Sequence, residues 1–169
     1  MDEIKIRIAQ TPDVDSIVSL NHALFQEDAG QRDRTMNLNW ALKSGHEYFD
    51  TLLKQENVHC LIAQDGEDAV GYLIGYLLKP NSLRSVRLAE LESMFVKAEA
   101  RSSGIGAEMM SRFMAWCKEK GVDRVGVTAY AANARAIAFY QRHGFEPRNL
   151  ALEIDLRASD DGITPQSAA

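Results

Sequence analysis

Two glutamates in one short segment could perform acid–base chemistry. Glu90 and Glu92 lie two residues apart within residues 86–96, whose composition is typical of a β strand. Side chains at this spacing share one face of a strand, and Met94 and Val96 share it too if no bulge intervenes. Two carboxylates are costly to bury, so this face is expected to border water. Either carboxylate could take a proton from an amine, whose pKa of about 10.4 keeps it charged at pH 7. An exposed or ion-paired glutamate without a catalytic role is the alternative.

A glycine-containing motif follows this strand and opens the next helix. Arg101, Gly104 and Gly106 form the pattern Arg-x-x-Gly-x-Gly at the start of a helix predicted over residues 104–120. Glycines let backbone amides approach a ligand closely, and the unpaired N–H groups of a first helical turn suit a phosphate. The dinucleotide-binding fingerprint does not fit because Met109 stands in place of its third glycine, and the Gly-Lys-Ser/Thr of a Walker A loop does not follow. A tight turn with close packing is the alternative.

A second motif lies at a strand-to-helix junction further along the chain. It places an asparagine near the start of a helix predicted over residues 133–143, a Phe-Tyr pair late in that helix and a Gly-Phe exit, in the order Asn133, Ala136, Phe139, Tyr140, Gly144 and Phe145. Together the two motifs closely resemble those of the GNAT superfamily of acetyl-CoA-dependent N-acetyltransferases. The resemblance is clear from residue 86 to residue 145, with one departure at Ala98, where many members have proline.

The resemblance implies a cosubstrate, its contacts and two catalytic groups. It implies acetyl-CoA as the acyl donor, no metal, and direct attack of the acceptor amine in a ternary complex. Glu92 would act as the base, directly or through water, and Tyr140 would protonate the departing thiolate. Backbone N–H groups of Met94 and Val96 would hold the pantetheine arm and polarise the thioester carbonyl. The full set of implied contacts to acetyl-CoA is Met94, Phe95, Val96, Arg101, Ser102, Ser103, Gly104, Ile105, Gly106, Asn133 and Tyr140. Tyr140 could instead serve only in aromatic packing, and Asn133 could instead cap the N-terminus of its helix.

The distribution of charge bears on the acceptor. Residues 1–85 hold eight lysines and arginines against thirteen aspartates and glutamates, which accounts for the whole net charge of −5 because residues 86–169 hold eleven of each. This acidity argues against nucleic-acid binding and favours a small cationic amine, such as a polyamine or an aminoglycoside, as partner. Candidate acceptor contacts are Glu90 and three residues of the polar segment 27–45, namely Glu27, Asp28 and Trp40. The segment could form a lid or a partly helical excursion, and Trp40 could instead pin it to the core.

Two other functions stay open at this point. A protein N-terminal or lysine acetyltransferase would carry the same motifs beside an open groove for an extended peptide. A non-catalytic acyl-CoA-binding regulatory module would keep the cofactor loop without turnover. The presence of both Glu92 and Tyr140 counts against the second of these.

Hydrophobic periodicity predicts the elements that must position these residues. Alternating or apolar runs predict strands over residues 4–9, 58–63, 69–78, 86–96, 124–130 and 150–156, and amphipathic periodicity predicts helices over residues 12–25, 46–55, 104–120 and 133–143. The order of these elements predicts an α/β (α+β) fold with a mixed, largely antiparallel central sheet, one parallel strand pair and flanking helices. Residues 1–157 are expected to form a single domain, and residues 158–169 a disordered tail.

Composition narrows the cellular setting. Cys60 and Cys117 lie far apart without metal-ligand spacing, so buried reduced thiols are expected, with neither a disulfide nor a metal site. The start Met1-Asp2-Glu3 does not resemble a signal peptide, and no apolar run reaches the roughly 18 residues of a membrane span. A cytoplasmic protein that does not associate with membranes is expected, and the resemblance suggests a homodimer.

Overall fold

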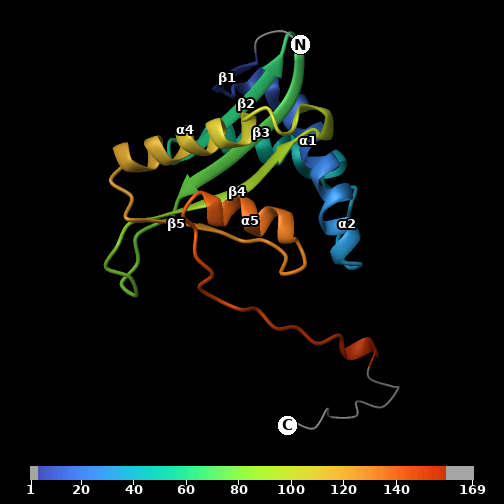
Figure 1. Ribbon diagram of the computed structural model, residues 1–169, viewed down its shortest axis with the longest axis vertical. Helices are drawn as coiled ribbons and strands as arrows, with labels where there is room; N and C mark the ends of the chain where they lie inside the picture. The colour runs from blue at the N-terminus through green and yellow to red at the C-terminus, as the bar shows by residue number, and fades with distance from the viewer. Residues whose placement is uncertain (1–3, 159–169) are drawn as a thin grey trace.

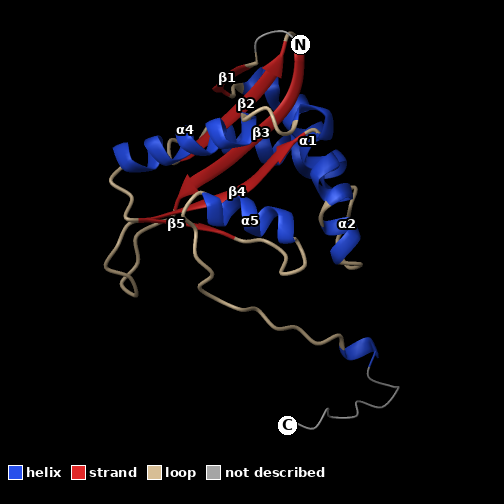
Figure 2. Ribbon diagram, viewed as in Figure 1, coloured by secondary structure: helices blue, strands red, loops and turns tan. Residues whose placement is uncertain are grey.

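The computed structural model describes residues 4–158 and centres on one mixed β sheet (Figure 1, Figure 2). Its five strands lie side by side in chain order: β1 (Lys5–Ile8), β2 (Val58–Asp65), β3 (Asp68–Leu77), β4 (Leu88–Val96) and β5 (Arg124–Val127). Neighbouring strands are antiparallel except β4 and β5, which run parallel because a helix returns the chain between them. The predicted mixed sheet with one parallel pair is confirmed. The expected tail over residues 158–169 lies outside the described residues apart from its first position.

Helices cover both faces of the sheet (Figure 2). On one face, α1 (Val14–Glu27) and α3 (His46–Leu53) bury Ile17 and Phe49 against Tyr72 of β3. On the other, α4 (Ile105–Glu119) buries Met109 and Phe113 against β2, β3 and β4. The last helix, α5 (Ala134–Arg142), lies beside β5 at the edge of the sheet (Figure 1). The remaining helical pieces are α2 (Ala29–Arg32), a π-helical turn (Ala41–Gly45) and 3-10 turns at Thr11–Asp13, Ala98–Ala100 and Leu156–Ala158. Segment 27–45 is therefore the partly helical excursion that was one of its two predicted forms.

A partly buried ion pair fixes the entry into α1. The carboxylate of Asp13 accepts hydrogen bonds from both terminal nitrogens of Arg7, each 2.7 Å long, and from the backbone N–H of Gln10 at 2.8 Å. The hydrogen bonds from Arg7 lower the pKa of Asp13, although burial opposes this shift. The carboxylate thus ties β1 to the start of α1 in its charged form.

A β-bulge interrupts β4 at Glu92. Leu91 pairs with Gly75 and Ser93 pairs with Ile74, so Glu92 is the extra residue opposite β3. The bulge reverses the alternation of side chains, and Met94 and Val96 consequently join the core beneath α4 rather than sharing the face of the two glutamates. The sequence placed Met94 and Val96 on the face of the glutamates only if no bulge intervened, and the bulge at Glu92 removes that condition. Gly75 allows the distortion, since a Cβ there would lie 2.6 Å from the backbone oxygen of Glu90.

The strand predicted over residues 150–156 is wrong for this structure. Residues 146–156, called the C-terminal arm below, pair with no strand of the described chain, and β5 remains an edge strand that ends at Val127 rather than at the predicted Tyr130. The four apolar residues of the arm alternate as expected but are 66–84% exposed. Alternation defines which face of a strand would be buried, but a strand also needs a neighbour that satisfies its backbone groups. No strand of the described chain supplies one.

No helix among residues 4–158 is long and apolar enough to cross a membrane. Within the same residues, no group of three or more His, Cys, Asp or Glu side chains could hold a metal ion. Cys60 and Cys117 are both buried and unpaired, as expected from their spacing.

Candidate active site

The candidate site begins where β4 and β5 separate. The two strands pair only from Leu88 to Leu91, whereas β4 continues to Val96, so the edge of residues 92–96 that faced β5 is open. The backbone N–H of Lys97 donates to the carbonyl of Val70 on β3 at 2.8 Å. Because successive N–H groups of a strand alternate between its two edges, those of Met94 and Val96 point to the open edge. Two backbone donors thus become available to a ligand lying between the strands.

The loop after β4 brings further backbone donors to the same region. It turns through Ser102 and Gly104, whose φ angles are +64° and +84°, and ends at the first residue of α4. The first-turn N–H groups of α4 have no partner within the helix, which suits an anionic group. A Cβ on Gly104 would meet no atom within 4 Å, so this position is open, whereas a Cβ on Gly106 would lie 3.0 Å from Met94. The two motif glycines therefore serve different needs, a left-handed turn at 104 and close packing of α4 on β4 at 106.

Arg101 fastens this loop to the rest of the protein. Its Nε donates to the carbonyl of Val96 at 2.8 Å, its Nη2 donates to Glu27 at 2.6 Å, and its guanidinium lies 5.4 Å from the centre of the Phe95 ring. The side chain is therefore engaged by protein groups on β4 and α1. Phe95 itself is buried in the core beneath α1, which leaves only its backbone near the open edge.

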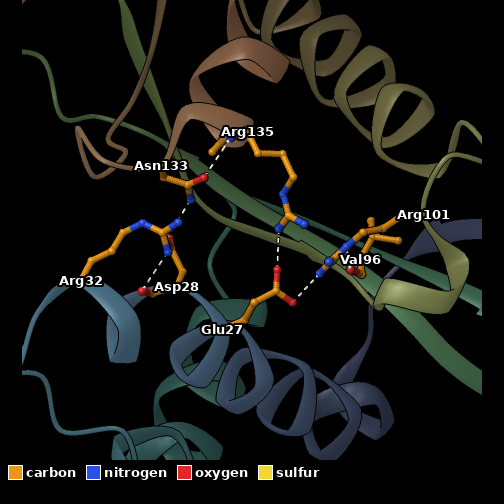
Figure 3. A network of polar contacts seen from close by, with 8 residues as sticks. Glu27, Asp28, Arg32, Val96, Arg101, Asn133 and Arg135 are labelled. Atoms are coloured by element: carbon orange, nitrogen blue, oxygen red, sulfur yellow. Dashed lines mark hydrogen bonds and ion pairs between the residues drawn. The ribbon is translucent and has the colours of Figure 1, made fainter.

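Glu27 and Asp28, at the end of α1, form an ionic cluster that we call the acidic latch (Figure 3). Glu27 accepts hydrogen bonds from both Arg101 and Arg135, and Asp28 pairs with Arg32 at 2.8 Å and accepts one from Asn133 at 2.8 Å. Burial works against the charged form of Glu27, but the hydrogen bonds from the two arginines outweigh it and lower its pKa.

The latch spans three parts of the fold. Through it the end of α1 holds both the loop before α4 and the start of α5 (Figure 3). Asn133 caps α5, because its Oδ1 accepts a hydrogen bond from the N–H of Ala136 at 3.1 Å. The capping role that was the alternative for Asn133 is confirmed.

Glu92 carries a half-buried carboxylate on β4. It accepts a hydrogen bond of 2.9 Å from the hydroxyl of Tyr48 on α3. Burial raises the pKa of Glu92, the hydrogen bond from Tyr48 opposes this rise, and the charge of Glu90 adds to it. A carboxylate whose pKa lies above its ordinary value is a stronger base than an exposed one.

A buried hydrogen-bond chain supports the bulge that carries Glu92. Asn21 of α1 donates to the hydroxyl of Tyr72 at 2.8 Å, and that hydroxyl donates to the side chain of Ser93 at 2.9 Å. Sequence reasoning missed Asn21, Tyr72 and Ser93. Their contribution depends on the bulge, and no motif in the sequence marks it.

Tyr140 lies on the other side of β4. It packs in the same cluster as Met94 and Val127, which flank the point where the strands separate, and its ring contacts Phe145 edge-on at 5.6 Å. Burial, with a smaller contribution from the charge of Asp28, raises the pKa of Tyr140 to about 12. The hydroxyl therefore keeps its proton at neutral pH and can donate it.

Trp40 pins segment 27–45 to the core. Its ring stacks on Phe25 with centroids 5.9 Å apart and meets Tyr48 edge-on at 5.2 Å. The same ring therefore supports the tyrosine that donates to Glu92. The pinning role is confirmed, and contact with an acceptor stays a prediction.

The acetyltransferase (GNAT) family model matches residues 19–145, three quarters of the chain. The chain belongs to this family. Both motifs found in the sequence lie inside the matched region or at its end, and the region extends back across segment 27–45 and the three central strands.

Individual relatives agree with the GNAT assignment. An uncharacterized N-acetyltransferase of Methanocaldococcus jannaschii is 25% identical over 103 residues, which cover 61% of this chain and 46% of the relative. The chain thus spans about half the length of this relative. A mutant of the BH1408 protein from Bacillus halodurans has a TM-score of 0.81 at 21% identity, covering 90% of this chain and 99% of its own. An aminoglycoside acetyltransferase from an uncultured soil metagenomic sample, solved with sisomicin, has a TM-score of 0.68 at 20% identity, covering 90% and 96%. At these identities the two structures show a shared fold.

The GNAT fold brings together some predicted site residues and separates others. Met94, Val96 and the loop over residues 101–106 meet at the opening between β4 and β5, with Ile105 buried so that only its backbone is available. Glu92 lies on the α3 side of β4, beside Glu90. Glu27 and Asp28 are engaged with arginines and Asn133 in the acidic latch, and their contact with an acceptor stays a prediction.

Proposed function

We propose that this GNAT-family protein transfers an acetyl group from acetyl-CoA to a primary amine by direct attack, with a small cationic molecule as acceptor. The observation that carries the proposal is Glu92, a half-buried carboxylate with a raised pKa, held by Tyr48 beside the free backbone donors of β4. This arrangement places a base next to a place where a carbonyl oxygen could be polarised.

The residues at the opening fit acetyl-CoA. The open position at Gly104 and the unpaired first-turn N–H groups of α4 would receive the phosphates, and the N–H groups of Met94 and Val96 would hold the thioester. Acetyl-CoA, when bound, supplies the acetyl group as an activated thioester. Ser102 and Ser103 would present backbone donors, since the Ser103 hydroxyl already donates to the carbonyl of Ala100 at 2.6 Å.

Glu92 and Tyr140 divide the proton transfers between them. Glu92 takes the proton of the acceptor ammonium, directly or through one water, so that the amine nitrogen carries a free electron pair. Tyr140 holds its proton at Oη because its pKa is about 12, and it gives this proton to the sulfur that leaves. Neither step needs a metal ligand from the protein.

Aromatic and acidic side chains favour a cationic acceptor. Glu90 and Glu92 lie on one face of β4, and Tyr76 lies directly opposite Glu90 on β3. Burial raises the pKa of Tyr76, and the charges of both glutamates raise it further. Carboxylates beside tyrosine rings form a setting in which an ammonium group is stabilised by ion pairing and by the ring faces. Because the latch engages Glu27 and Asp28, the proposed acceptor contacts are Glu90, Glu92 and Tyr48.

A thiol-release assay with acetyl-CoA tests the proposal against polyamines, aminoglycosides, amino acids and peptides. We expect turnover with small polycationic amines, a fall of about 10²-fold or more in kcat for Glu92→Gln and for Tyr140→Phe, and acetyl-CoA affinity within about threefold of wild type. Glu90→Gln is the matched control on the same strand face and should change KM for the amine more than kcat. Turnover with peptides alone would refute the proposal that the acceptor is a small molecule. Binding of acetyl-CoA without turnover for any amine would refute the proposal that the protein catalyses acetyl transfer.

A further inference from the structure

Ser93 ends a hydrogen-bond chain that starts in the core. The side-chain amide of Asn21 donates to the hydroxyl of Tyr72 at 2.8 Å, and this hydroxyl donates to Oγ of Ser93 at 2.9 Å. Asn21 is 3% exposed and Tyr72 is 0% exposed, whereas Ser93 is partly exposed. The chain therefore leads from a sealed position in α1 to an accessible hydroxyl on β4.

The direction of the chain leaves the hydrogen of Ser93 free. An amide nitrogen only donates, so the hydroxyl of Tyr72 accepts from Asn21 and gives its own hydrogen to Ser93. Burial raises the pKa of Tyr72 more than its hydrogen bonds with Asn21 and Ser93 lower it, so this hydroxyl keeps its hydrogen and remains a donor. The hydroxyl hydrogen of Ser93 has no acceptor among residues 4–158. It is therefore oriented to donate to a group outside the chain.

Packing alone does not require this polar chain. The ring of Tyr72 lies in the same cluster as Ile17 and Phe49, where a phenylalanine ring would fill nearly the same space. Buried polar groups are costly unless they are fully hydrogen-bonded, and Oδ1 of Asn21 is buried without a partner within the described chain. We therefore expect the chain to serve the group at its outer end, which is the hydroxyl of Ser93.

The bulge places this hydroxyl beside the proposed base. In a regular strand the side chains of Glu92 and Ser93 would point to opposite faces. Here both face the layer of α1 and α3, because Glu92 contacts Tyr48 of α3. Ser93 in turn contacts Tyr72 beneath α1. A carboxylate and an oriented hydroxyl thus lie on consecutive residues, directly before the free backbone donor of Met94.

This pair of groups suits a water molecule better than an ammonium group. The hydroxyl of Ser93 has a hydrogen to donate, and an ammonium group also only donates, so the two do not complement each other. A water oxygen can accept a hydrogen bond from each of them, and its own hydrogens can donate to the carboxylate of Glu92. Both residues are only partly buried, so water can reach them.

We propose that Ser93 is a positioning residue that holds a water molecule against Glu92, and that the proton of the acceptor ammonium reaches Glu92 through this water. This role rests on the function proposed above and selects the water-mediated route of the two described there. One N–H bond of the acceptor breaks and its proton passes to the water oxygen. The water gives one of its own protons to a carboxylate oxygen of Glu92, and the amine nitrogen keeps the electron pair.

The test is steady-state kinetics of the full-length chain with acetyl-CoA and the amine that gives the highest turnover in the thiol-release assay. Ser93→Ala should lower kcat about tenfold, with KM for the amine and acetyl-CoA affinity within about threefold of wild type. Ser93→Thr keeps the hydroxyl and should stay within about threefold of the wild-type kcat. Tyr72→Phe frees the hydroxyl of Ser93 to rotate and should lower kcat about threefold. Asp13→Asn is the matched control, because it removes a charged hydrogen-bond acceptor at the start of α1 and should leave kcat unchanged.

Coupling to Glu92 separates this role from a purely structural one. Because Ser93 acts through Glu92, the double variant Glu92→Gln with Ser93→Ala should lose no more kcat than Glu92→Gln alone. A double variant that loses the product of the two single effects would mean that Ser93 acts by shaping the strand. A raised KM with unchanged kcat in Ser93→Ala would mean that Ser93 contacts the acceptor directly. Either result overturns the proposal, as does an unchanged kcat and KM in Ser93→Ala.

The same measurements distinguish this inference from the proposed function. If Glu92→Gln lowers kcat as expected while Ser93→Ala does not, the role of Ser93 is wrong and the proposed function stands. If Glu92→Gln keeps the wild-type kcat, or if no amine gives turnover, the proposed function is wrong and the role of Ser93 is overturned with it. Far-ultraviolet circular dichroism and urea titration check that each variant is folded under the assay conditions.

Discussion

Replacing Tyr48 with phenylalanine should move the acidic limb of the pH–rate profile upward. The hydroxyl of Tyr48 donates to Glu92 at 2.9 Å, which stabilises the charged form of that carboxylate and opposes the effect of burial on its pKa. Tyr48→Phe removes this hydrogen bond and leaves the ring in place. The pKa of Glu92 must then rise further above its ordinary value, since burial and the charge of Glu90 both remain.

The size of the shift follows from the strength of the lost bond. A hydrogen bond to a charged group contributes about 1.5–3 kcal/mol when it is shielded from water. Tyr48 is 37% exposed, so the lower end of this range applies. Because one pKa unit corresponds to about 1.4 kcal/mol, we expect the pKa of Glu92 to rise by about one unit.

The assay is kcat/KM for the amine measured from pH 5 to pH 9, whose acidic limb reports the base of the free enzyme. At pH values below the acidic limb, Tyr48→Phe should have a kcat/KM about tenfold lower than the wild type. At pH values well above the limb, the two proteins should have equal activity. Tyr76→Phe is the control, because Tyr76 lies near the same carboxylates and should leave the limb in place. The reasoning is refuted if the limb stays unmoved in Tyr48→Phe, or if both variants move it equally.

Two further predictions concern the ion pairs. Hydrogen bonds from Arg7 lower the pKa of Asp13, so the stability they add is fully present above the unfolded pKa of about 3.9 and is lost as the pH falls through the lower folded value. Asp13→Asn should therefore lower the free energy of unfolding by about 2 kcal/mol at pH 7, and urea titration at pH 2.5 should find the two proteins nearly equal; an equal loss at both pH values would contradict this. Glu27→Gln removes the charge that joins Arg101 to Arg135, and because these groups are partly exposed the loss of stability should stay below about 1 kcal/mol and shrink in 1 M salt. A salt-independent loss would mean that Glu27 acts through packing.

Local signals in the sequence predicted most of the fold. Apolar runs predicted β2 and β3 over residues 58–63 and 69–78, and the Asp65-Gly66 step between them is typical of a hairpin turn, in which Gly66 has a positive φ of +60°. The Arg-x-x-Gly-x-Gly pattern predicted the loop at the start of α4, because the need for a left-handed turn at Gly104 is a property of the residue itself. Features that depend on one residue and its immediate neighbours can be read in this way.

Features that depend on distant partners could not be predicted. The bulge at Glu92 arises from the register between β3 and β4, and the acidic latch joins Glu27 to residues 74 and 108 positions away. Acidic residues at the end of a helix suggest nothing about which arginine will meet them. The prediction of a strand over residues 150–156 was wrong for the same reason. The alternation of apolar residues there is clear, but the local sequence does not show where a partner strand would lie.

The extra residue in β4 has a consequence for how such an enzyme can change. It turns the carboxylate of Glu92 toward α1 and α3, while Met94, Val96 and Tyr140 belong to the side of α4 and α5. Under the proposed mechanism, substitutions that reshape the α2–α3 region would therefore alter which amine is accepted without disturbing the donor side. A deletion of one residue at this point would exchange the two faces of β4 from residue 93 onward. In that mechanism the bulge assigns the acceptor base and the donor contacts to opposite faces of one strand, so the length of β4 at this point matters to both.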